Sequence, residues 1–75
     1  MSGPAVYRIA VRGRVDSDWA ARLEGMDITA RRGDDNEVET VLVGRLEDQA
    51  ALAGLLSTLY ELHLPVILAE CLESG

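Results

Sequence analysis

The chain has 75 residues and a formal net charge of −6, and all seven of its basic residues are arginine. This length allows one domain, predicted here over residues 1–75. Residues 46–75 contain five acidic residues and no arginine, which argues against a nucleic-acid surface. One cysteine and one histidine provide neither an internal disulfide nor a zinc ligand set, so no metal or cofactor is predicted.

Membrane and secretory signals are missing from the sequence. No run of about 18 apolar residues is present, so no membrane span or membrane partner is expected. The N-terminal residues MSGPAVYRI do not show a charged region followed by an apolar one, as a signal peptide would. A lone cysteine suits a reducing compartment, and the predicted localisation is cytoplasmic.

Residues 5–12 alternate between two kinds of side chain, which predicts a half-buried strand. One face carries Tyr7, Ile9 and Val11, and the other carries Arg8, Ala10 and Arg12. Asp16 and Asp18 then indicate a helix start. A short helix of about two turns is expected up to Gly25, with Trp19 as an anchor in the core and Leu23 on the same face.

Two further strands follow. Met26, Ile28 and Ala30 alternate with polar residues and predict the second strand, and residues 32–36 form a polar turn. The third strand, over 37–43, has apolar residues on both faces, which is typical of a central strand covered on both sides. Gly44-Arg45 is expected to turn into the next helix.

The longest helical pattern spans residues 48–64. Its apolar stripe consists of Leu52, Leu55, Leu56, Leu59, Leu62 and His63, which fall within an arc of about 120°. Glu47 and Asp48 suit the N-terminal end, and Pro65 stops the helix. The outer face carries Ala50, Ala53, Gly54 and Ser57, whose small side chains form a solvent face or an alternative interface.

Residues 65–72 predict a last strand, again apolar on both faces. The resulting order of strand, helix, strand, strand, helix, strand predicts an α+β fold. We expect the ferredoxin-like βαββαβ two-layer sandwich, a four-stranded antiparallel sheet in the order 4-1-3-2. A short first helix and a long second helix would cover one face of the sheet.

The other face of this sheet would be open and apolar at its centre. Its predicted interface residues are Ala10, Val41, Val43, Val66 and Leu68, with Arg8 and Arg12 at the rim. An apolar middle within a polar rim is typical of a protein interface, although scattered exposed aliphatic residues are also normal on small domains.

Catalytic and ligand-binding motifs are sparse. His63 and Cys71 have no partner nearby in sequence, which favours structural roles for both. Residues 34–37 carry oxygen ligands but lack the spacing of a calcium loop. Tyr7 is expected to face the helices, which argues against base stacking on the sheet. These features favour a non-enzymatic function.

Three segments carry a resemblance: Trp19 before Glu24-Gly25, the strand end TVLVG at 40–44 and the helix DQAALAGLL at 48–56. The chain resembles a family of small bacterial proteins of unknown function, and this resemblance implies no site residue. A more distant, fold-level similarity is to ACT-type regulatory domains, which implies pairing and amino-acid binding at an interface.

Two functions remain as hypotheses. The first is a non-enzymatic protein–protein interaction module that assembles as a homo-oligomer through the open sheet face, or acts on another protein. The alternative is an amino-acid sensor of ACT type, with its site at a subunit interface near residues 13–17.

Overall fold

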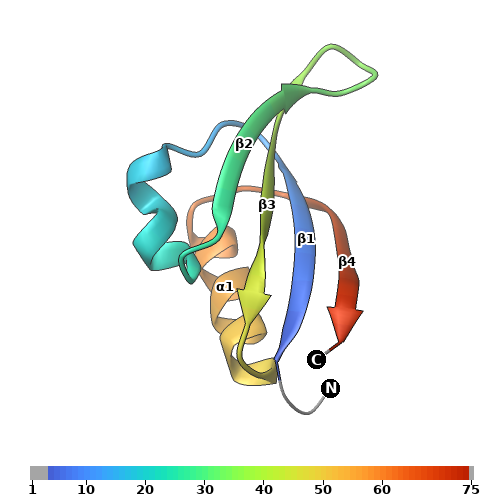
Figure 1. The fold of residues 1–75 in the computed structure, drawn as a ribbon. Helices are drawn as coiled ribbons and strands as arrows, with labels where there is room; N and C mark the ends of the chain where they lie inside the picture. The colour runs from blue at the N-terminus through green and yellow to red at the C-terminus, as the bar shows by residue number, and fades with distance from the viewer. Residues whose placement is uncertain (1–3, 75) are drawn as a thin grey trace.

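The computed structural model describes residues 4–74, as four strands, one α-helix and one 3-10 helix (Figure 1). Residues 1–3 and 75 of the predicted domain lie outside the described residues. The elements in chain order are β1 (Ala5–Arg12), η1 (Ser17–Leu23), β2 (Asp27–Arg32), β3 (Val38–Leu46), α1 (Gln49–Glu61) and β4 (Val66–Ser74). No helix in the described part is long and apolar enough to cross a membrane.

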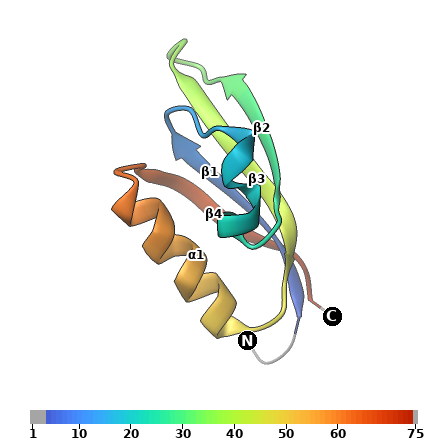
Figure 2. The same ribbon diagram turned by 90° about the vertical axis from the view of Figure 1, so that its left-hand side faces the viewer.

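The four strands form one antiparallel sheet in the order β2-β3-β1-β4. Read from the other edge, this is the predicted order 4-1-3-2, which is confirmed. β1 lies inside the sheet and pairs with β3 along its whole length, from Ala5 opposite Leu46 to Arg12 opposite Glu39. Figure 2 shows η1 and α1 on the same side of the sheet, so the opposite side carries no helix.

The predicted first α-helix is wrong in type, because Ser17–Leu23 forms a 3-10 helix. Its start shows why. The N–H of Trp19 donates to the carbonyl of Asp16 at 3.0 Å, a contact three residues apart, and the Asp16 side chain accepts from the N–H of Asp18 at 3.1 Å. So short a segment gains little from α-helical bonds once nucleation is counted. Residues 4–74 therefore contain one α-helix, and the full βαββαβ pattern with two α-helices is not confirmed.

β3 extends beyond its predicted end and includes Gly44 and Arg45, which were expected to form a turn. Gly44 lies opposite Tyr7, at a position where a side chain would face the helical side of the sheet. A methyl group at this position would lie 2.9 Å from Cγ of Met26 and 3.1 Å from its Cα. Glycine therefore lets the segment before β2 pack directly on β3, and Met26 is buried as a result.

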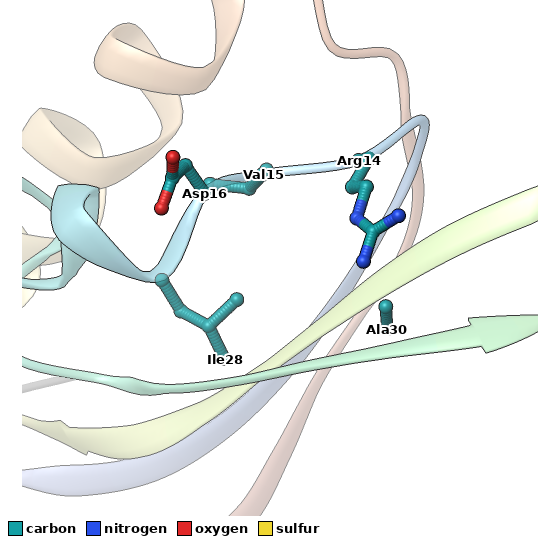
Figure 3. Close-up of a pocket in the computed structure, with 5 residues that line it drawn as sticks. All are labelled: Arg14, Val15, Asp16, Ile28 and Ala30. Atoms are coloured by element: carbon teal, nitrogen blue, oxygen red, sulfur yellow. The ribbon is translucent and has the colours of Figure 1, made fainter.

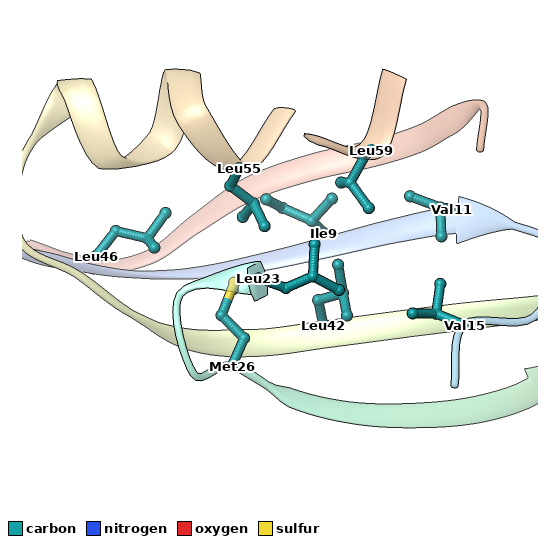
Figure 4. Close-up of a cluster of buried hydrophobic side chains, with 9 residues drawn as sticks. All are labelled: Ile9, Val11, Val15, Leu23, Met26, Leu42, Leu46, Leu55 and Leu59. Atoms are coloured by element: carbon teal, nitrogen blue, oxygen red, sulfur yellow. The ribbon is translucent and has the colours of Figure 1, made fainter. Parts of the chain in front are cut away.

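α1 begins and packs largely as predicted. Asp48 is the N-cap, and its side chain accepts a hydrogen bond from the N–H of Ala51 at 2.8 Å. Leu55 and Leu59 are fully buried. Figure 4 shows them above the sheet, within a single cluster of buried side chains. The members of that cluster are Ile9, Val11, Val15, Leu23, Met26, Leu42, Leu46, Leu55 and Leu59.

The C-terminal end of α1 differs from the prediction, because the helix ends at Glu61 and His63 is exposed. The N–H of His63 donates to the carbonyl of Tyr60 at 3.0 Å, and that of Leu64 donates to Leu59 at 3.1 Å. These two bonds form a Schellman motif, which needs a left-handed residue at its corner. His63 fills that position with φ of 59°, which turns its side chain away from the apolar stripe.

This corner generates a stability prediction. His63→Gly should raise the free energy of unfolding by about 0.5–1 kcal/mol, because glycine adopts positive φ without a Cβ clash. Urea denaturation followed by circular dichroism measures the difference. His63→Ala is the control and should not stabilise the protein, since it keeps the Cβ. Equal gains from both variants would contradict the assignment of strain to this residue.

Candidate interaction surface

The side of the sheet without helices forms the open face. Alternation along each strand places one set of side chains on it, opposite to Ile9, Val11 and Leu42, which Figure 4 shows pointing toward α1. By register, the open face contains Val6, Arg8, Ala10, Arg12, Asp27, Thr29, Arg31, Glu39, Val41, Val43, Arg45, Leu68, Glu70 and Glu73. No aromatic residue belongs to this set.

The centre of the open face is apolar and only partly accessible. Thr29, Val41, Ala10 and Leu68 form one row across the four strands. Leu68 is 40% exposed, Val41 is half-buried, and Ala10 is 1% exposed. Val43 is half-buried in the neighbouring row. Ala10 therefore forms the floor of this surface, and the larger side chains around it would make the contacts.

Val66, the remaining predicted interface residue, is placed differently by an irregularity in β4. The register shifts between Ala10 and Val11, so Val66 lies opposite Val11, whose side chain points toward α1. Ile67 and Leu68 instead join Ala10 around a shallow hollow of about 350 Å³ on the open face. The shift could not be found by counting alternate residues, because an inserted residue changes the parity of the strand.

Two ion pairs cross the open face within the chain. Arg8 on β1 lies 2.7 Å from the carboxylate of Glu70 on β4, and Arg31 on β2 lies 3.4 Å from that of Glu39 on β3. An arginine at the rim of an interface can pair with an acidic residue of a partner molecule. Here Arg8 already uses Glu70 within its own chain, so this part of the rim is held in place before any partner arrives.

Arg12, the other rim arginine, pairs with Asp35 in the β2–β3 loop at 2.7 Å. The hydrogen bond from Arg12 is the main cause that lowers the pKa of Asp35 below its usual 3.8, and Asp35 in turn raises the pKa of Arg12. The stabilisation is thus present above about pH 3.8 and is lost as pH falls through the lowered pKa. Both side chains are nearly half exposed, which keeps the effect on the free energy of unfolding small.

Charge on the open face is balanced. It carries four arginines, Arg8, Arg12, Arg31 and Arg45, and four acidic residues, Asp27, Glu39, Glu70 and Glu73. The rest of the chain holds three arginines and nine acidic residues, so the net charge of −6 lies outside this face. Two copies of the protein would therefore repel least when their open faces meet.

A second hollow lies at the start of η1, on the helical side of the sheet. It has a volume of about 560 Å³ and is lined by Arg14, Val15, Asp16, Ile28 and Ala30 (Figure 3). Figure 3 shows the two charged side chains on the loop after β1, above apolar residues of β2. This is the region, near residues 13–17, where the sequence placed a ligand site.

One buried hydroxyl holds the wall of this hollow. Thr40 on β3 is fully buried; its Oγ1 donates to the carbonyl of Gly13 at 2.7 Å and accepts the N–H of Val15 at 3.1 Å. The loop after β1 is therefore attached to β3 by hydrogen bonds to a side chain instead of to the backbone. Sequence reasoning missed this role, because a threonine in a strand gives no sign of which loop it will reach.

The other candidate side chains named from the sequence do not come together in one site. Trp19 is half-buried, packs against the core, and has the guanidinium of Arg22 5.1 Å from its ring centroid. His63 is exposed after α1, and Cys71 is exposed on β4. Within residues 4–74, no group of three or more histidine, cysteine or acidic side chains is arranged to hold a metal ion. The small outer face of α1, Ala50, Ala53, Gly54 and Ser57, is exposed.

Comparison with known families gives one match. Residues 6–70 match the family described as Domain of unknown function (DUF8691). The chain belongs to this family. No curated protein matches the chain, and no solved structure does. The matched segment begins in β1 and ends at Glu70 in β4, so it includes all the residues of the open face except Glu73.

The role of Thr40 can be tested without changing the size of the side chain. Thr40→Val should lower the free energy of unfolding by about 1–3 kcal/mol, because it leaves a buried N–H and a carbonyl without partners. Thr29→Val is the matched control: it changes an exposed threonine on β2 and should shift stability by no more than about 0.5 kcal/mol. Equal urea midpoints for the Thr40 variant and wild type would show that water replaces the hydroxyl.

Proposed function

We propose that this protein is a non-enzymatic assembly module, which forms a homo-oligomer by pairing its open sheet face with that of a second copy. The observation that carries the proposal is the charge balance of this face on an otherwise acidic protein. Its apolar row gives the contact a water-excluding centre. We further propose that the topology is that of a ferredoxin-like sandwich with its first helix reduced to η1.

The four strands present one continuous open face to a second copy. A two-fold axis would bring one patch against its own copy. The ion pairs of Arg8 and Arg31 are made within the chain, and Arg31 and Glu39 line the hollow beside Ala10 and Leu68.

The proposal excludes other partner classes. The open face has as many acidic residues as arginines, and Tyr7 packs on the helical side, so neither charge nor stacking favours a nucleic acid. His63, in the turn after α1, and Cys71, on β4, are both exposed, which supports a non-enzymatic function. No cofactor or metal takes part.

The test is a single added charge at the proposed interface. Val43→Glu should reduce the particle mass in light scattering by about half, because two buried carboxylates would face each other near the two-fold axis without partners. Ala53→Glu, which adds the same charge on the outer face of α1, should leave the mass unchanged. Circular dichroism checks that both variants fold.

Three results would decide against the open face. A monomeric wild type at high concentration would end the idea of self-assembly. An unchanged mass for Val43→Glu would remove the open face as the interface. Loss of mass with Ala53→Glu alone would move the interface to the alternative surface, the Ala50, Ala53, Gly54 and Ser57 face of α1.

A second candidate function is ligand sensing of ACT type, and the hollow near η1 is the observation that favours it. Its rim carries a guanidinium from Arg14 and a carboxylate from Asp16 above the apolar Ile28 and Ala30. A cation, an anion and an apolar floor match the carboxylate, amine and side chain of an amino acid.

Thermal unfolding tests this second function. An amino-acid ligand should raise the melting temperature in proportion to the logarithm of its concentration, and Arg14→Gln should remove the shift. Simple carboxylates and simple amines are the controls, since each has half of the required charges. A panel of the twenty amino acids that produces no shift at millimolar concentration would rule out this candidate.

A further inference from the structure

β4 is an edge strand whose side chains are almost all accessible. From Val66 to Glu73, only Glu70 is partly buried, and the other residues are classed as exposed. Val66, Ile67, Leu68 and Leu72 are 40–44% exposed, and together with Tyr60 they are the large apolar residues most open to solvent in the described chain. In Figure 1, α1 lies behind β3, and β4 forms the edge of the sheet beyond β1.

The two edges of the sheet differ in how they are protected. β2, at one edge, has the sequence DITARR, in which half of the residues are charged. β4, at the other edge, has the sequence VILAECLES and contains no basic residue and no proline. Charges and prolines are what natural proteins use to prevent an edge from pairing with another strand. The protection of β4 is limited to Glu70, Glu73 and two register irregularities, which lie on either side of Leu68–Cys71.

We propose that β4 pairs edge to edge with β4 of a second copy, antiparallel about a two-fold axis at Ala69, to form a continuous eight-stranded sheet. A short, apolar, β-branched segment with little charge is well suited to pair with itself. This contact goes beyond the proposed function and does not rest on it. It uses the outer backbone of β4, whereas the open face uses side chains on one side of the sheet.

Alternation restricts where the axis can lie. Opposing residues of an antiparallel pair point to the same side of the sheet. A two-fold axis perpendicular to the sheet must therefore lie midway between one residue and the same residue of the second copy. At Glu70 the axis would place two carboxylates directly opposite each other. At Ala69 it brings together two small side chains.

The pairs next to Ala69 combine apolar residues with Glu70. Leu68 comes opposite Glu70, and Ile67, which lies at a register irregularity of β4, comes opposite Cys71. The charge of Glu70 is already paired with Arg8 of the same chain at 2.7 Å. The segment Leu68–Cys71 also lies between the two register irregularities of β4, so it is regular enough to accept a neighbouring strand.

Disulfide trapping tests both the contact and its register. In a Cys71→Ser background, Ala69→Cys should oxidise to a cross-linked dimer on a non-reducing gel. Directly opposed residues have Cα atoms about 4.5–5.5 Å apart, within the reach of a disulfide. Leu72→Cys in the same background is the matched control. Its two copies would lie roughly 20 Å apart, and it should form dimer at least about tenfold more slowly.

The outcomes separate this contact from the open-face contact. No cross-link at position 69, or an equal rate at position 72, overturns the edge pairing. Adding Val43→Glu to the Ala69→Cys variant should leave the cross-link intact, and its loss would show that the edge contact depends on the open face. If Val43→Glu leaves the particle mass unchanged while position 69 still cross-links, the open-face proposal fails and the edge contact stands.

Discussion

The whole fold depends on one thin layer of apolar contacts between α1 and the two central strands. Leu55 and Leu59 are fully buried in the same cluster as Ile9 and Leu42, which lie opposite each other on β1 and β3. A chain of this size has little surface to bury, so one helix supplies most of the cover. η1 adds Leu23, but covers only the region near β2.

This narrow cover has a consequence for the rest of the molecule. An α-helix is about 10 Å wide, whereas four strands at about 4.8 Å spacing are nearly twice as wide. The central strands are buried on the helical side, whereas the large apolar residues of β4 remain 40–44% exposed. The accessible aliphatic residues therefore gather at one edge and on the open face, the two places where a second molecule can replace the missing cover.

The distribution of charge also sets the open face apart from the rest of the molecule. The open face is neutral, and the acidic excess lies in the loops, since η1 contains one acidic residue and one arginine and α1 contains a single glutamate. Acidic residues at the helix starts accept hydrogen bonds from nearby backbone N–H groups. Asp48 caps α1, and Asp16 accepts from the N–H of Asp18 in η1. Asp35 also orders the β2–β3 loop by accepting from Arg12 and from the N–H of Glu37. The acidity of the chain thus reflects capping and turn formation as much as any partner.

Two neighbouring residues of β3 support the two opposite sides of the sheet. Thr40 lies on the helical side of β3 and binds both Gly13 and Val15, which fixes the loop that walls the hollow near η1. The neighbouring residue Glu39 points to the open face and meets Arg31. Alternation along one strand therefore supports both the candidate ligand site and the candidate interface.

The sequence by itself determined the elements that rest on local rules. Period-two alternation located β1 and β2, the Asp48 cap and the leucine spacing located α1, and handedness determined the sheet order. Tertiary structure decided what local rules do not reach. The type of η1 depended on its length and on Asp16, the extension of β3 depended on close packing of Met26 against Gly44, and the position of His63 depended on a left-handed corner. An extra residue in β4 moved Val66 away from Leu68, because strand parity is fixed by pairing with β1 rather than by the order of residues along β4.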